Sequence, residues 1–391
     1  MLQAVALMCS FGLGMCFSLL GSISVKLMPR VKMDAGKFGT LISTFMFACL
    51  IASLVIGVVT DAIGYKWVAL VGFLATATCI FVLASGKSYN TVMLPCVLLG
   101  MGAMAMNTVA NVMGPQILFE GKDPAAANNF VNVFFGLGLF LTPLIVSFLF
   151  RKTTYEKAVS TLGVIIILPA IIALLAKGYP ESSNKLDIAA AVGLLREPAV
   201  LVAGFVLFCY IALESSFCNW LPLFGKEVVK TENPAVEDAV ADASGQRLLS
   251  FFAVAMMVGR LATSQVRGLT QIGGFVIAGA ALVAAVVIFL MMGCKKGAVA
   301  NILAILAGLA FAPCFPTTIG VTFSKFKPEI YGSIFGIIFA VGLAGAVIVP
   351  KMMGNVAKGA SIQKSLKLLL PACVLLIILA VVLGQLKGIA G

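Results

Sequence analysis

Twelve apolar segments, separated by short polar stretches, run through this sequence. Each is close to the roughly 20 apolar residues that an α-helix needs to cross ~30 Å of hydrocarbon. Only 11% of the residues are charged, against about 25% in a soluble globular chain. We therefore expect an all-α integral membrane protein with twelve transmembrane helices. The segments cover residues 3–25, 38–60, 67–86, 91–114, 127–150, 158–176, 198–224, 248–266, 272–293, 298–323, 331–350 and 366–386.

The two halves of the chain repeat one another. Gly57 corresponds to Gly259 at an offset of 202 residues, and GLFLTP, from Gly138, corresponds to GAVIVP, from Gly345, at an offset of 207 residues. A slow drift of this kind is what loop insertions produce. We therefore predict two pseudo-symmetric six-helix bundles, since repeats of this kind are frequent in transporters.

The polar stretch KGYPESSNKLDIAAAVGLLREP separates six apolar segments from six, and a short surface helix is expected in its middle. The predicted organisation is an N-terminal bundle over residues 1–177, a central cytoplasmic linker over 178–197 and a C-terminal bundle over 198–391. The acidic stretch Thr231–Gly245 is expected to be a flexible loop.

The ten cysteines form no CxxC pair and lie almost entirely inside the apolar segments, and the sequence has no histidine. This composition argues against a disulfide framework and a zinc site, and the segments offer no nucleophile–base pair for an enzyme. The net charge is +12, and the basic residues are scattered over short loops. This distribution favours anchoring at the membrane over binding of nucleic acid. We expect no cofactor, and a monomer with the lipid bilayer as a partner.

The sequence GVVTDAIGYKW between the second and third segments carries Gly57, Asp61, Gly64 and Lys66 at the spacing G-x3-D-x2-G-x-K. It resembles the loop signature of the major facilitator superfamily, with Ala62 where a basic residue is usual. The resemblance implies a cytoplasmic gating loop that latches one conformation. A plain tight turn is the alternative interpretation.

Several longer stretches are similar to the fucose:proton symporter family, among them FCYIALESSFCNWL (Phe208–Leu221) and YGSIFGIIFAVGLAGAVIVPKMMG (Tyr331–Gly354). The resemblance implies the major facilitator fold, a central polar cavity, alternating access and cation-coupled sugar uptake. The family has acidic residues late in the first span and in the fourth span. Gly21 and Asn107 stand at those places here, and neither can carry a proton.

Glu214 is the one acidic residue well inside an apolar segment. A charge near the bilayer centre costs roughly 2.5–3.5 kcal/mol on insertion scales, so Glu214 should be neutral, paired or facing water. It is either a cavity-facing residue that binds cation, proton or substrate, or a protonated structural acid. Arg260 lies only seven residues before Arg267, so a direct pair with Glu214 is not expected. Arg260 is interpreted as a gating residue, with snorkelling to the headgroups as the alternative.

Amide side chains gather in the fourth and fifth segments. Asn107 and Asn111 are four residues apart and share a helical face, and Asn128 and Asn132 repeat that spacing. These amides are predicted to bind sugar hydroxyls or sodium, or else to join helices to one another.

Four further residues are candidates for a solute site. Asn219 and Trp220 follow Glu214 closely, and an aromatic face beside polar groups suits a sugar, although Trp is also a common membrane anchor. Phe315 and Thr317 lie among prolines in the tenth segment. A break there would leave carbonyl groups available for ligand or ion, and a simple kink is the alternative.

These observations predict a secondary active transporter of the cell membrane. The expected solute is small and polar, a sugar on the family resemblance, moved by alternating access with a proton or sodium gradient. The alternative is a proton-coupled exporter of amphipathic compounds with Glu214 as a proton switch. The resemblance places both termini in the cytoplasm, whereas the distribution of Lys and Arg favours the reverse.

Overall fold

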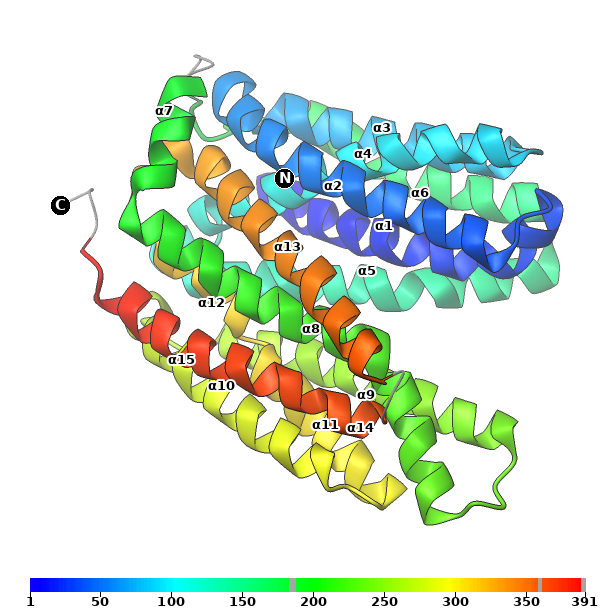
Figure 1. Cartoon of the computed structure of the whole chain (residues 1–391). Helices are drawn as coiled ribbons and strands as arrows, with labels where there is room; N and C mark the ends of the chain where they lie inside the picture. The colour runs from blue at the N-terminus through cyan, green and yellow to red at the C-terminus, as the bar shows by residue number, and fades with distance from the viewer. Residues whose placement is uncertain (183–187, 358–360, 388–391) are drawn as a thin grey trace. The chain divides into compact units, whose positions relative to one another are not determined.

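The computed structural model in Figure 1 describes residues 1–182, 188–357 and 361–387. These residues form helices and no strand. The first half contains α1 (Leu2–Arg30), α2 (Ala35–Ile63), α3 (Tyr65–Ser85), α4 (Tyr89–Ile117), η1 (Phe119–Gly121), α5 (Pro124–Lys152) and α6 (Tyr155–Leu175). The second half contains α7 (Ile188–Gly193), η2 (Leu194–Arg196), α8 (Pro198–Glu232), α9 (Asp238–Thr263), α10 (Leu269–Met292), α11 (Gly297–Phe311), α12 (Cys314–Phe323), η3 (Pro328–Ile330), α13 (Tyr331–Ala357), α14 (Ile362–Ser365), η4 (Leu366–Leu369) and α15 (Leu370–Gln385).

Among the described residues, eleven helical stretches are long and apolar enough to cross a membrane, and they match eleven of the predicted segments. The segment predicted at 248–266 corresponds to α9, which has 26 residues and packs against α8 and α11. It is not among the eleven, and it carries four charged residues: Asp238, Asp242, Arg247 and Arg260.

The expected loop over Thr231–Gly245 is largely helical, so that prediction is wrong. Helix α8 runs 35 residues to Glu232, and α9 begins at Asp238. Lys226 pairs with Asp242 at 2.8 Å and Lys230 pairs with Asp238 at 2.9 Å. These ion pairs join the two helices beyond their apolar parts.

The chain divides into two compact units. One comprises Met1–Gly121, Val131–Leu194 and Lys327–Ile337, and the other comprises Lys122–Phe130, Leu195–Phe326 and Ile338–Gly391. The starts of α5 and α13 are therefore grouped apart from the rest of their helices. The boundaries predicted at the central linker remain a prediction, and linker residues 183–187 lie outside the described residues. The expected short helix of the linker is α7.

Small residues allow the helices of the first unit to pack closely. Helix α4 packs against α1, α2 and α3, and α3 also packs against α6 (Figure 1). Gly14 of α1 and Gly138 of α5 face one another's helices, and a Cβ on either would collide with the opposite backbone. This close approach fixes the position of α5 against α1.

The second unit has an aromatic core and a broken helix. The rings of Phe217, Phe252 and Phe311 lie 4.8 to 5.7 Å apart. Helix α11 ends at Phe311 and α12 begins at Cys314, with Pro313 between them. The break predicted in the tenth segment is confirmed, and every residue of α12 is buried.

Candidate transport site and gating contacts

Three buried amides of the first unit form a continuous chain of hydrogen bonds. The Asn111 amide nitrogen donates to Oδ1 of Asn107 at 2.7 Å, and the Asn132 amide nitrogen donates to Oδ1 of Asn111 at 2.8 Å. All three side chains are at most 4% exposed. The predicted face of α4 therefore meets α5 through these amides, and the bonds join helices in this conformation.

Glu214 and Arg260 are in direct contact, contrary to the prediction from sequence. Arg260 Nη2 lies 3.5 Å from Glu214 Oε1 and donates to the Tyr210 hydroxyl at 3.3 Å. The Arg260 side chain is 3% exposed, so it does not snorkel, and that of Glu214 is 22% exposed.

Helix register explains the contact. Gly225 of α8 touches Gly245 of α9, and the helices run antiparallel through a short turn. Fifteen residues further along α9 lies Arg260, and fifteen residues back along α8 lies Tyr210. Helix α9 ends at Thr263, well before the level at which α8 begins. The sequence-based estimate wrongly assumed that the end of α9 and the start of α8 lie at the same depth.

A second polar contact joins α5 to α12. The Asn129 amide donates to Thr317 Oγ1 at 3.0 Å and to the Ala125 carbonyl at 2.9 Å, and both side chains are fully buried. Within the part of the chain that the structure describes, Oδ1 of Asn129 has no hydrogen-bond partner.

The remaining solute-site candidates lie in different surroundings. Phe315 packs against Tyr210 and Phe339 with ring centroids 6.3 and 6.0 Å apart. Trp220 donates from Nε1 to the Pro350 carbonyl at 3.1 Å, as a helix-joining residue would. Asn219 is exposed. Phe315 therefore lies beside the Glu214–Arg260 region through Tyr210, whereas Trp220 is held by α13.

Two of the residues predicted to gate, Gly57 and Asp61, lie in the last two turns of α2, where Asp61 caps the start of α13. Its carboxylate accepts from the Gly332 amide at 2.8 Å, the Ser333 amide at 2.7 Å and the Ser333 hydroxyl at 2.6 Å. The first amides of a helix lack partners within that helix and favour a negative charge. Asp61 is 8% exposed, and Gly57 lies so close to Gly332 that a Cβ on either would collide.

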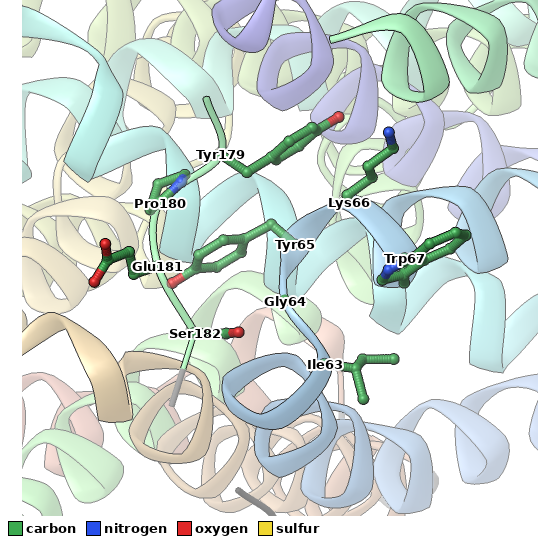
Figure 2. A pocket seen from close by; sticks show the side chains of 9 residues that line it. All are labelled: Ile63, Gly64, Tyr65, Lys66, Trp67, Tyr179, Pro180, Glu181 and Ser182. Atoms are coloured by element: carbon green, nitrogen blue, oxygen red, sulfur yellow. The ribbon is translucent and has the colours of Figure 1, made fainter. Parts of the chain in front are cut away.

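The turn between α2 and α3 lines an open cavity of about 500 Å³, which is shown in Figure 2. Gly64 has a φ of +85°, a conformation that L side chains rarely adopt. Lys66 follows it, and residues Tyr179–Ser182 form the opposite wall. Burial raises the pKa of Tyr179 to about 12, and its hydroxyl donates to the Ala173 carbonyl at 2.6 Å.

The family model described as Major Facilitator Superfamily matches residues 6–350 of the chain. The chain belongs to the Major Facilitator Superfamily. It is therefore a transporter and not an enzyme. No curated protein sequence matches the chain.

Solved transporters of this superfamily share the fold. The E. coli fucose:proton symporter is 20% identical, with 98% of each chain covered and a TM-score of 0.76. FucP in the outward conformation is 18% identical, with 98% of this chain and 99% of that chain covered and a TM-score of 0.78. The human organic anion transporter MFSD10 is 15% identical, with 97% of each chain covered and a TM-score of 0.74. The sequence-based resemblance to the superfamily and its fucose:proton symporters is thus confirmed at the level of family and fold.

One carboxylate of this superfamily member was missed by sequence reasoning. Asp123 Oδ2 accepts from the Leu269 amide at 2.8 Å, and its Oδ1 accepts from the Thr270 amide at 3.1 Å and the Thr270 hydroxyl at 2.6 Å. Asp123 also accepts from the Ala126 amide at the start of the helix that follows it. It therefore caps the starts of α5 and α10 together.

The repeat relates this contact to that of Asp61. The 207-residue offset maps Gly332 and Ser333 onto Ala125 and Ala126, and the 202-residue offset maps Asp61 onto Thr263. The second half thus lacks a carboxylate at the end of α9, and Asp123 supplies one from the start of α5 instead. The sequence signal that could have found it is the cap pattern Asp–Pro at a helix start.

Proposed function

We propose that the chain is a secondary active transporter that moves a small polar solute across the cell membrane by alternating access, coupled to a proton or sodium gradient. The observation that carries the coupling is Glu214, an acid in the interior of a 35-residue helix beside Arg260. An ionisable residue at that depth is costly and is usually functional. Its side chain is 22% exposed, so the carboxylate is not fully enclosed by the helices around it.

A polar solute is supported by the buried amides. Asn107, Asn111 and Asn132 present donors and acceptors that now bond to one another. Such groups can exchange their mutual bonds for bonds to solute hydroxyls or to sodium. A sugar is further supported by the shared fold with a protein described as a fucose:proton symporter.

The capping carboxylates Asp61 and Asp123 would hold one conformation of the transport cycle. Each accepts three hydrogen bonds from the start of a helix distant in sequence. With both termini in the cytoplasm, these contacts would lie at the cytoplasmic face. A cysteine placed at Lys185, outside the described residues, tests the orientation. Its labelling from outside intact cells by an impermeant reagent would reverse the assignment.

An exporter of amphipathic compounds is the second candidate. The aromatic group around Tyr210, with Phe311 and Phe315 at 6.4 and 6.3 Å, favours a solute with apolar surface. Glu214 would then exchange a proton against substrate.

Uptake into proteoliposomes distinguishes the two functions. Purified protein is tested under imposed inward proton or sodium gradients with a panel of neutral and acidic sugars and amphipathic dyes. Gradient-driven accumulation of a sugar or sugar acid supports the symporter. Movement of the dyes alone, driven by an opposing proton gradient, supports the exporter, and transport of neither class contradicts both.

A further inference from the structure

In the second unit the positive charge of Arg260 is balanced by the neighbouring carboxylate of Glu214. Arg260 keeps its positive charge in proteins, and Glu214 Oε1 lies 3.5 Å from its Nη2. The surroundings are largely apolar: the Tyr210 hydroxyl contacts Met256 Sδ at 3.8 Å, and the Tyr210 ring packs on Phe315. A buried guanidinium in such surroundings is strongly destabilised when a neighbouring carboxylate is neutralised.

Proton coupling through Glu214 creates that situation. When Glu214 takes up a proton, Arg260 keeps its charge and loses the negative charge beside it. A neutral sugar cannot replace that charge, whereas a carboxylate can, since its two oxygens match the planar guanidinium fork. Binding of an anion and protonation of Glu214 should therefore favour one another.

We propose that the transported solute is a small polyhydroxy carboxylate, of the sugar-acid class, whose carboxylate replaces Glu214 on Arg260 when Glu214 is protonated. This inference rests on the proposed function and narrows its substrate class. One proton and one carboxylate enter the site together, so the charge of the site is unchanged. The hydroxyl groups of the solute would bind polar side chains elsewhere on the transport route.

The other titratable groups near the pair do not alter this charge balance. Helix α11 carries none, and α15 carries only a cysteine. Phenol and thiol groups have ordinary pKa values of about 10 and about 8.5, so they are neutral near pH 7. The groups concerned are Tyr210 and Cys218 on α8, Cys314 on α12 and Cys373 on α15.

The test uses pairs of ligands that differ only in the acid. D-gluconate is compared with D-sorbitol, D-galactonate with galactitol, and D-glucuronate with D-glucose, by calorimetric titration of the purified protein between pH 5.5 and pH 8. We expect at least one acid to bind at least tenfold more tightly than its neutral counterpart. Its affinity should rise up to tenfold per unit fall in pH, because one proton is taken up with each anion.

Variants separate the two partners of the pair. Glu214→Gln resembles the protonated acid, so it should bind the acid with an affinity that no longer depends on pH. Arg260→Gln should lose at least tenfold in affinity for the acid, and the double variant keeps the comparison possible if that single variant is unstable. Lys226→Gln is the matched control on α8, because Lys226 pairs with Asp242 away from this site.

Each outcome bears on the proposal. If each neutral compound binds as tightly as its acid, or if no acid binds, the proposed substrate class is wrong. In that case gradient-driven accumulation of neutral sugars by the same protein would leave the symporter function intact. Uptake of the acid should also be unchanged by an imposed membrane potential, and a clear dependence on potential would contradict the joint uptake of one proton with one anion.

Discussion

The Asp61 carboxylate accepts a hydrogen bond from the Ser333 hydroxyl at 2.6 Å, across 272 residues of sequence. It also accepts from the backbone amides of Gly332 and Ser333. Hydrogen bonds to a charged group contribute roughly 1.5–3 kcal/mol each, so this residue fixes the first turn of α13. Because all three hydrogen bonds join one carboxylate to two consecutive residues, they can break together.

Asp61→Asn should change turnover more than equilibrium affinity for the solute. The amide has one acceptor oxygen and no charge for the start of α13, so the latched conformation loses on the order of 1–3 kcal/mol. Rates of exchange in proteoliposomes and binding by titration measure the two quantities. Asp34→Asn, at the opposite end of α2, is the control because Asp34 caps its own helix. A large loss of affinity with unchanged turnover would count against the latch.

Asp123→Asn should have the same kind of effect as Asp61→Asn. Asp123 accepts from Leu269 and Thr270 at the start of α10, whose N-cap, Gly268, has no side chain to do so. If the two contacts hold the same conformation, the double variant should raise the free energy of that conformation by about the sum of the increases in the two single variants. Labelling of an introduced cysteine near Ala125 reports that population. Unchanged labelling in Asp123→Asn would exclude the role.

Gly57→Val should block the close approach of α2 to the start of α13. A Cβ at Gly57 would collide with the Gly332 backbone, so the latched conformation should be lost and transport reduced at least tenfold. Gly39→Val is the matched control on the same helix, because a Cβ at Gly39 meets nothing within 4 Å among the described residues. Equal transport by the two variants would show that the approach is dispensable.

Sequence patterns predicted those features that depend on local composition. The apolar segments, the break at Pro313 and the turn around Gly64 each follow from residues a few positions apart. The shared face of Asn107 and Asn111 also followed from helical spacing, and the structure adds a hydrogen bond from Asn132 of α5 to that face.

Contacts that depend on helix register could not be obtained in this way. The pairing of Glu214 with Arg260 requires the level at which α8 and α9 meet, which the contact of Gly225 with Gly245 sets. The role of Asp123 requires knowledge that α10 begins beside α5. In both cases the contact joins residues far apart in the sequence, on different helices, and helical periodicity does not predict which of them meet.

Asn111→Leu should destabilise the first unit and weaken solute binding. Asn111 both donates to Asn107 and accepts from Asn132, so its removal breaks both hydrogen bonds. Each lost bond costs about 0.5–1.5 kcal/mol, measurable as a lower unfolding temperature in detergent. Asn301→Leu on α11 is the control, since Asn301 Oδ1 has no hydrogen-bond partner among the described residues. Equal stability of the two variants would show that the amide chain contributes little.

Glu214→Gln should abolish gradient-driven accumulation while preserving binding or exchange. The substitution keeps the shape and hydrogen-bonding ability of the side chain and removes its ionisation, so the Tyr210–Arg260 bond at 3.3 Å can persist. Coupling through an ionisable group needs that group to change charge during the cycle, and Glu214 is the one acid well inside an apolar segment. Accumulation under a proton or sodium gradient and counterflow without a gradient measure coupling and exchange separately. A variant that accumulates solute as well as the parent protein would make Glu214 a structural acid only.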